Sequence, residues 1–342
     1  MVAKTKVKKT WNILIKIALV AAAYGFLYHQ LFFEKKADHI LRAIDTYSGS
    51  ERVMWSLAGV LLLMGVNWGI EAYKWRYLLH MEETINVGRS LKAVFAGITV
   101  SIFTPNRTGE FLGRVFILRR TNPWRAIFIT IVGSFSQLMV TLVAGYIAFV
   151  IFAYEYLLNE FSLSNYLFFA IAIFTGVVIL LLMLLYLNVG VLDPVLHRLI
   201  RSRWRKVGQY FSVFSRFDTL KLVEVFGLSL LRYMVFSLQF ILLLKAFKVP
   251  VSWPEGMMLV SVMFFVMTAI PTVTLAELGI RGSVTIGIFQ IFLQDAGLFS
   301  EAVKFSVFAA SSGVWLINLA LPAIIGTFFV FQLRFFKKNN DS

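Results

Sequence analysis

Two short stretches of the chain combine charged side chains with residues that interrupt helices, and apolar sequence surrounds both. The first reads TPNRTGEFLGR and the second IPTVTLAELGIRG, so each contains a Pro, then a Glu, then a Gly and an Arg. A charged side chain at the centre of a bilayer costs about 2.5 to 3.5 kcal/mol on the most lenient scale. We therefore expect these residues to pair with one another or to line a water-filled cavity.

The chemistry expected of these stretches is ligand binding. Arginine side chains and helix ends bind anionic groups such as phosphate, whereas a buried Glu can recognise a cationic group or exchange a proton. The candidate substrate-binding residues are Arg107, Glu110, Arg114, Glu277 and Arg281, and the candidate backbone breaks are Pro105, Gly109, Pro271 and Gly279. One alternative stays open, because the glutamates could pair with the arginines only to hold the structure together.

Three more polar residues lie within apolar runs and form a candidate polar path: Gln137, Arg232 and Gln239. Arg232 and Gln239 are seven residues apart, which places them on one face of a helix. The alternative for such residues is a hydrogen bond between neighbouring helices. The spacing of Gly109 and Gly113 predicts close packing of two helices.

The elements around the two breaks are too short to cross a bilayer. The run Leu91–Thr104 has 14 residues, about 21 Å of helix against a hydrocarbon core of about 30 Å. Phe111–Leu118 follows the first break, and basic residues flank both runs, which predicts a hairpin that enters from the cytoplasm and returns. Met257–Ile270 and Ser283–Leu293 repeat the pattern and predict a second hairpin, entering from outside.

Six longer apolar runs are predicted to span the membrane, with both termini in the cytoplasm. They are Trp11–Phe33, Val53–Ile70, Ala126–Ala153, Tyr166–Leu187, Leu222–Leu244 and Val303–Phe331, the last kinked at Pro322. Each half then contains two spans, one re-entrant hairpin and a third span. Three crossings per half predict an inverted-topology repeat, residues 11–153 and 166–333. The alternative is a plain bundle of kinked spans.

The segment 189–221 is the most basic part of the chain. Apolar residues recur in it at helical spacing, with arginines and lysines between them. This pattern predicts an amphipathic helix that lies on the inner leaflet and contacts anionic headgroups.

The overall composition is that of an integral membrane protein. The chain has 342 residues, of which 59% are hydrophobic, and its formal net charge is +15. We interpret the whole chain, 1–342, as one membrane domain. We expect its partners to be lipids rather than nucleic acid, and a homo-oligomer is possible. There is no cysteine, nucleotide-binding loop, serine-hydrolase elbow or metal-ligand spacing, so we expect no metal, no cofactor and no enzyme activity.

At the two breaks the sequence resembles the transmembrane, flippase-like domain family of lysylphosphatidylglycerol synthases. The likeness rests on Pro105, Arg107, Gly109, Glu110 and Arg114, with the return Leu118, Arg119, Arg120, and more loosely on Pro271, Glu277 and Gly279. The family often carries a Glu-Arg pair early in the span after the first hairpin, where this chain reads Gly133 to Gln137. The full synthases append a soluble aminoacyl-transferase domain, whereas this chain stops at Ser342.

The resemblance implies lipid translocation between leaflets without lipid-modifying chemistry. The leading hypothesis is a flippase-like transporter in the cytoplasmic membrane, which moves a phospholipid, aminoacylated or not, or a lipid-linked phosphate. Two alternatives stay open. One is a membrane-embedded transferase that uses Glu110 or Glu277 as general base, and the other is a non-transporting partner of a lipid-modifying enzyme.

Overall fold

The computed structural model describes residues 51–102, 104, 107–118, 120–158, 164–199, 210–271 and 274–330, with five isolated positions among the first fifty. These residues form helices and short connections, and no strand occurs among them. The all-α class is therefore confirmed. It is the class expected in lipid, because a helix satisfies its backbone hydrogen bonds within one segment.

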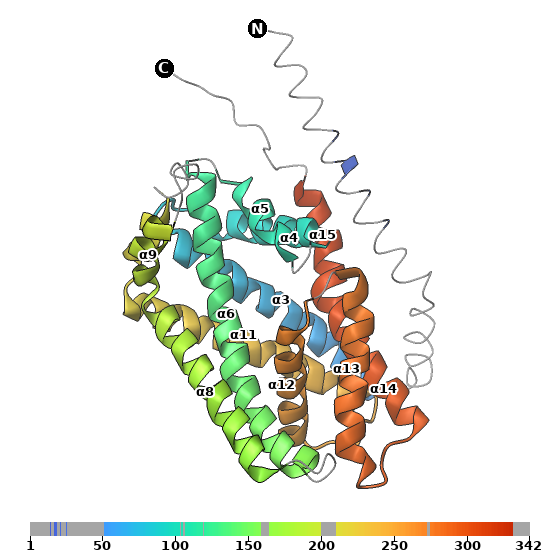
Figure 1. Ribbon diagram of the computed structural model, residues 1–342. Coiled ribbons are helices and arrows are strands. Elements are labelled where there is room, and N and C mark those ends of the chain that lie inside the picture. The colour runs from blue at the N-terminus through green and yellow to red at the C-terminus, as the bar shows by residue number, and fades with distance from the viewer. Residues whose placement is uncertain are drawn as a thin grey trace, which may run out of the picture.

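The helices pack side by side and cross one another (Figure 1). The longer ones are α3 (Glu51–Leu79), α6 (Pro123–Phe152), α8 (Asn165–Leu187), α11 (Thr219–Ala246) and α13 (Thr274–Gln294). The shorter ones are α4 (Val87–Ser101), α5 (Gly109–Val115), α9 (Leu192–Leu199), α12 (Trp253–Ala269), α14 (Glu301–Trp315) and α15 (Leu321–Val330). Two short π-helices are η3 (Ala153–Leu157) and η7 (Leu316–Ala320), and two short 3₁₀-helices are η4 (Val189–Val191) and η6 (Phe211–Arg216).

Within the described part of the chain, five helical segments are long and apolar enough to cross a membrane. They are Val53–Leu79, Pro123–Leu157, Asn165–Leu187, Thr219–Ala246 and Glu301–Val330. All five overlap predicted spans, so the protein is a multi-pass membrane protein. The sixth predicted span, Trp11–Phe33, lies outside the described residues apart from isolated positions, and the total of six stays a prediction.

The last span contains an irregular turn where the sequence predicts a kink. The π-helical turn η7 directly precedes α15, in which Pro322 is the second residue. Proline cannot donate the backbone hydrogen bond that a regular helix requires at that position. The span Glu301–Val330 is nevertheless continuous in helical structure.

The first predicted hairpin is a pair of short helices, α4 and α5, in backbone contact. A Cβ atom added to Gly113 would lie 2.5 Å from the Cα of Gly97, and one added to Gly109 would lie 2.5 Å from the carbonyl oxygen of Val100. The predicted close packing at Gly109 and Gly113 is therefore present. Helix α5 is shorter than the predicted leg and starts two residues earlier, at Gly109.

The second predicted hairpin has a break shorter than expected. Helix α12 ends at Ala269 and α13 already begins at Thr274, nine residues before the predicted leg. Gly279 therefore lies inside a helix and is not a break, whereas Pro271 does lie between the helices. The reason is that leucine, alanine and glutamate favour helix, and Glu277 pairs with Arg281 one turn later. Whether either helix pair re-enters the membrane stays a prediction.

The two halves of the chain pack against each other reciprocally. Phe95 in α4 and Ser261 in α12 each lie ten residues before the proline of their break. Gly326 in α15 packs directly on the backbone carbonyl of Phe95, and Gly145 in α6 packs on that of Ser261, which lies 3.1 Å from an added Cβ. The last helix of each half thus contacts the first hairpin leg of the other half, as two related units would. The inverted orientation itself stays a prediction.

Ion pairs tie several of the connections between helices together at one end of the bundle. At one end Glu82, which follows α3, pairs with Arg125 at the start of α6 (3.1 Å) and with Arg216 before α11 (2.7 Å). Phe152, Val249 and Leu293, which lie in or beside other connections, belong to one large buried cluster. The topology across the membrane stays a prediction.

The predicted inner-leaflet helix at 189–221 requires a correction. Its described residues form η4, α9 and η6, and α11 already begins at Thr219. Phe211, Phe214 and Phe217 are buried in a protein core, and the ring of Phe211 lies 4.9 Å from that of Phe128. The periodic apolar residues of this part therefore face the bundle, because α6 offers them a packing surface. Residues 200–209 lie outside the described part.

Candidate functional site

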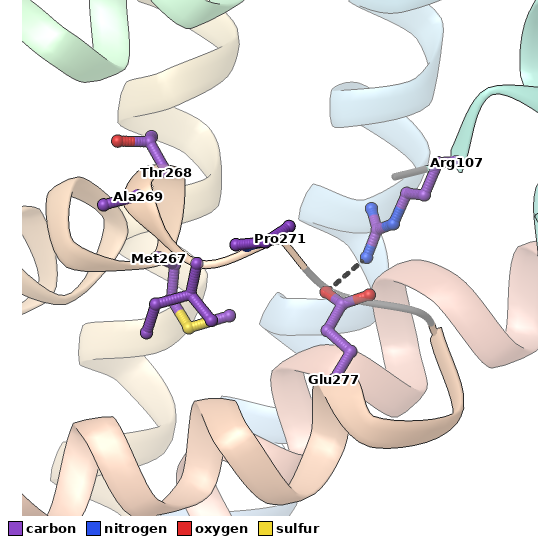
Figure 2. A pocket seen from close by; sticks show the side chains of 7 residues that line it. Arg107, Met267, Thr268, Ala269, Pro271 and Glu277 are labelled. Carbon is purple, nitrogen blue, oxygen red and sulfur yellow. Dashed lines mark hydrogen bonds and ion pairs between the residues drawn. The ribbon is translucent and has the colours of Figure 1, made fainter. Parts of the chain in front are cut away.

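The two predicted breaks contact each other through an ion pair. The Arg107 guanidinium donates to the Glu277 carboxylate at 2.6 Å (Figure 2). Arg281 donates to the same oxygen at 2.8 Å. Glu277 is 5% exposed and Arg281 is 9% exposed. One carboxylate therefore joins a residue from the first break to helix α13 of the second half.

Arg107 holds an unusual backbone conformation in the turn before α5. Its φ of 58° lies in the left-handed region, which residues with a Cβ atom adopt infrequently and at some cost. Its side chain is also the most accessible of this triad, at 36% exposed, against 11% for Arg281 and 6% for Glu277. Arg107 is thus the member of the triad best placed to meet a ligand.

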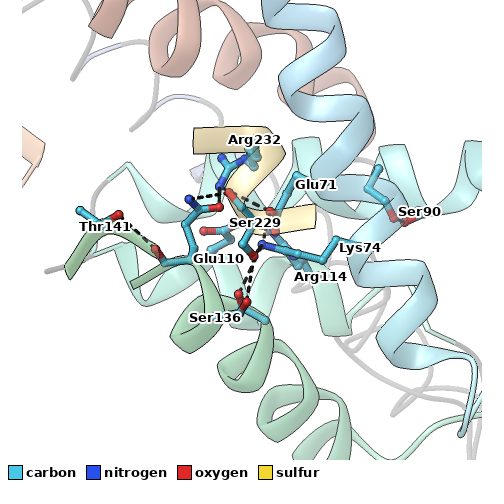
Figure 3. Close-up of polar contacts among 12 residues, drawn as sticks. Glu71, Lys74, Ser90, Glu110, Arg114, Ser136, Thr141, Ser229 and Arg232 are labelled. Carbon is cyan, nitrogen blue, oxygen red and sulfur yellow. Dashed lines mark hydrogen bonds and ion pairs between the residues drawn. The ribbon is translucent and has the colours of Figure 1, made fainter. Parts of the chain in front are cut away.

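A second group of charges centres on Glu71 in α3 (Figure 3). Its carboxylate lies 2.7 Å from Arg114, 2.9 Å from Lys74 and 3.4 Å from Arg232. Arg114 also pairs with Glu110 one turn earlier in α5. This group links α3, α5 and α11, and all its members except Glu110 and Arg232 are at most 6% exposed.

Neutral polar groups surround this cluster. Lys74 donates to the Ser229 hydroxyl and to the Gly133 carbonyl oxygen, both at 3.3 Å. Arg232 donates to the Gln137 side-chain oxygen at 3.3 Å, and its guanidinium lies 5.0 Å from the Trp68 ring, within range of a cation–π contact. Lys74, which follows the end of the predicted second span, is 1% exposed, because α3 continues nine residues beyond Ile70.

Two neighbouring cavities lie against these groups. The first, of about 450 Å³, is lined by Arg107, Glu277 and the end of α12 (Figure 2). The second, of about 260 Å³, is lined by Arg107, Arg232 and Arg281. The lining residues common to both are Arg107, Met267 and Thr268. The first cavity has a volume in the range of about 300 to 1,000 Å³ that is typical of small-ligand sites, and the second is smaller and lined mostly by polar residues.

The two groups together carry more positive than negative charge. The cations are Lys74, Arg107, Arg114, Arg232 and Arg281, and the carboxylates are Glu71, Glu110 and Glu277. Five cations face three carboxylates, so two positive charges remain. Lys74, Arg114 and Arg232 share Glu71, and Arg107 and Arg281 share Glu277, so each of the three arginines of the second cavity shares its carboxylate with another cation.

Several predicted residues lie elsewhere or play another part. Pro105 lies outside the described residues, and Gly109 is the first residue of α5. Gln239 is fully buried and donates to the Val60 carbonyl oxygen at 2.9 Å, so it joins α11 to α3 and lines neither cavity described above. Gln137 and Arg232 do line the second cavity.

Glu71 and Lys74 were missed because the predicted second span ends at Ile70. A signal was available, since Asn67, Glu71 and Lys74 are spaced four and three residues apart, which places them on one helix face. Asn67 lines the second cavity, and its amide donates to the Asn318 side chain at 3.1 Å. Polar residues along one face of an apolar helix that also carries Trp68 and Trp75 indicate that this face lines a polar interior. They do not mark the end of the span.

These features define a class: a multi-pass helical membrane protein with charged residues buried at the junction of two helix pairs. The chain matches the family described as the lysylphosphatidylglycerol synthase TM region over residues 13–326. The protein belongs to this family, as its resemblance at the two breaks predicts, and membership indicates a function related to membrane lipids. A comparison with curated proteins finds no match.

Proposed function

We propose that this protein is a flippase-like transporter, which moves a lipid with a phosphate-containing headgroup between the leaflets of the cytoplasmic membrane. The substrate-binding residues in this proposal are Arg107, Arg232 and Arg281, with Glu277 holding two of them in place. Both termini lie in the cytoplasm, and the two helix pairs enter the membrane from opposite faces.

The observation that carries the proposal is the arginine-lined cavity. Arg107, Arg232 and Arg281 converge on one space of about 260 Å³. Only one carboxylate, Glu277, pairs directly with Arg107 and Arg281. Unmatched positive charge at membrane depth is costly, so it favours a site that receives an anion. A phosphate diester or monoester supplies that charge and several acceptors for the guanidinium donors.

The other predicted site residues have a structural role in this account. Glu110 and Arg114 pair with each other, and Arg114 with Glu71. Arg114 is 2% exposed, so the pair supports the clamp alternative for this half of the predicted site. We infer that Glu110 and Arg114 hold α5 against α3, while the residues around Glu277 contact the lipid.

The test is leaflet-resolved lipid exchange in proteoliposomes that contain only the purified chain. A tail-labelled phosphatidylglycerol is placed in both leaflets, and a membrane-impermeant quencher reports how fast the inner pool becomes accessible. The transporter predicts exchange well above that of protein-free vesicles, because no second protein is required for passage.

The matched control is Arg216→Gln, at an exposed arginine paired with Glu82 at the end of the bundle. This variant is expected to exchange lipid at the wild-type rate. Exchange no faster than in protein-free vesicles, with correctly folded wild-type protein, would contradict the proposal and leave the transferase and non-transporting partner readings.

A further inference from the structure

We propose that the second cavity selects a phosphate monoester headgroup and rejects a headgroup that carries an added amino acid. This inference rests on the proposed function and specifies the substrate class of the same site. It differs from what the family description alone suggests, because lysylphosphatidylglycerol carries a cationic amino acid. The features that decide between the headgroups are the charge of the lining, the guanidinium groups in it and the surplus charge.

The first feature is the charge of the lining. The charged residues that line the second cavity are Arg107, Arg232 and Arg281, and the polar ones are Asn67, Gln137, Thr141, Tyr233 and Thr268. None of these described lining residues is acidic. A lysyl ammonium placed there would meet three guanidinium groups, and like charges at such sites repel in a poorly screened environment.

Glu277 does not change this conclusion, although it lines the neighbouring cavity. One of its oxygens already accepts from Arg107 at 2.6 Å and from Arg281 at 2.8 Å. An ammonium that recruited Glu277 would have to displace these arginines and leave them without their anion. A buried cation that loses its partner is strongly disfavoured.

The second feature is the set of hydrogen-bond donors. The Nε–H groups of Arg232 and Arg281 are buried and have no hydrogen-bond partner. Arg281 as a whole is only 9% exposed. These two Nε–H groups are closed off by protein, so Arg232 and Arg281 line the cavity with other atoms of their side chains. Phosphate oxygens fit guanidinium donors because both offer bidentate geometry.

The third feature is the size of the surplus. Two positive charges remain in the two groups after the three carboxylates are counted, and three of the five cations are the arginines at this cavity. A phosphate diester such as phosphatidylglycerol supplies one negative charge. A monoester carries about −1.5 to −2 at neutral pH and adds an oxygen that accepts hydrogen bonds. The monoester therefore neutralises the site more completely.

The test compares headgroups on one acyl backbone in proteoliposomes of the full chain: phosphatidic acid, phosphatidylglycerol and lysylphosphatidylglycerol. We expect phosphatidic acid to exchange at least about tenfold faster than phosphatidylglycerol, the ratio given by one more charge-assisted hydrogen bond. Lysylphosphatidylglycerol should be the slowest. Equal rates for all three, or lysylphosphatidylglycerol fastest, would overturn the selectivity while leaving transport itself established.

A binding arm separates the two proposals. Soluble dihexanoyl phosphatidic acid, dihexanoyl phosphatidylglycerol and inorganic phosphate are added to the detergent-solubilised protein, and the melting temperature is measured. We expect the monoester lipid to raise the melting temperature more than the diester lipid does. Comparison with inorganic phosphate shows whether the lipid part is needed for binding. Stabilisation by the monoester without any exchange in vesicles would refute transport and support the site. No preference for the monoester would refute the site.

The variant arm locates the effect. Arg232→Gln should reduce the preference for phosphatidic acid over phosphatidylglycerol to about twofold or less, because one of the surplus charges is removed. Arg216→Gln should keep the wild-type preference. If Arg232→Gln does not fold, Arg107→Gln serves instead, since Arg107 is more exposed. An unchanged preference in the folded variant would contradict the assignment.

Discussion

At the residue scale, Glu71 is the acceptor that most of the buried cations share. Lys74, Arg114 and Arg232 approach its carboxylate from α3, α5 and α11. The carboxylate is therefore a structural centre, because removing its charge leaves three cations in a bundle interior. In contrast, Arg107 and Arg281 share Glu277 next to the cavity. The residues that hold the structure and those proposed to bind lipid are largely separate.

The first prediction concerns Glu71→Gln. The amide keeps the shape of the side chain but removes its charge, so Lys74, Arg114 and Arg232 lose their common partner. We expect a loss of about 3 to 5 kcal/mol of unfolding free energy, measured as a large fall in melting temperature in detergent.

The control for this prediction is Glu301→Gln. Glu301 is exposed and its pair with Lys304 is a surface one, so its loss should change the stability by at most about 1 kcal/mol. A Glu71→Gln protein as stable as the Glu301→Gln protein would show that Glu71 does not hold the cluster together.

The second prediction concerns Arg107→Gln. Its side chain is 36% exposed and Glu277 keeps Arg281 as a partner, so the variant should fold and melt closer to wild type than Glu71→Gln does. Lipid exchange should fall about tenfold or more, because a charge-assisted contact to the phosphate is lost. A folded Arg107→Gln protein with the wild-type exchange rate would contradict the role of Arg107.

Sequence alone predicts those members of the charged site that lie next to a break in an apolar run. The Pro, Glu, Gly and Arg pattern points to Arg107, Glu277 and Arg281, which the structure brings together. The same pattern does not distinguish these three residues from Glu110 and Arg114. Only the packing of the folded protein decides whether a side chain faces the cavity or a neighbouring helix. The pattern does not include Glu71, because the charged residues after Ile70 predict the end of the second span there.

At the element scale, the α4 and α5 pair depends on glycine. Gly113 lies against Gly97 with no room for a side chain. We predict that Gly113→Ala costs about 1 to 3 kcal/mol through overpacking of two backbones, measured by thermal melting, and that lipid exchange falls with it. The added methyl would push α5 away from α4 and shift the turn that carries Arg107.

The matched control is Gly65→Ala in α3, where an added Cβ meets nothing within 4 Å. Alanine in an open helical position should be neutral or stabilise by up to about 1 kcal/mol. Equal effects at Gly65 and Gly113 would mean that the close contact of the two helices is not required.

Element boundaries show where sequence reasoning reaches its limit. The apolar runs locate the five described spans correctly because hydropathy over some twenty residues is a strong signal. The apolar pattern predicts a start at Ser283, whereas α13 begins at Thr274 and includes the charged residues Glu277 and Arg281. The amphipathic pattern before α11 could not tell a lipid surface from the protein surface that Phe211 and Phe214 cover.

At the scale of the whole molecule, the reciprocal contacts of α15 with α4 and of α6 with α12 favour a pair of related units. The orientation of these units in the membrane can be measured directly, because the chain has no cysteine. Thr84 lies between α3 and α4, and Ala296 between α13 and α14; both are exposed.

We predict that single cysteines at Thr84 and Ala296 react with a membrane-impermeant maleimide from opposite sides, Thr84→Cys from the cytoplasm and Ala296→Cys from outside. The basic residues around the first position and the acidic loop at the second favour this orientation. Lipid exchange by each variant serves as the check that the fold is kept. Labelling of both cysteines from one side would refute the inverted repeat.

The measurement that bears most directly on the central claim is leaflet exchange of tail-labelled phosphatidic acid by purified wild-type and Arg232→Gln protein, at equal amounts of folded chain. If the arginine-lined cavity carries the headgroup, the wild type exchanges the lipid far faster than protein-free vesicles, and the variant is slower by about tenfold or more. Exchange at the same rate by both proteins, or by neither, would contradict the account.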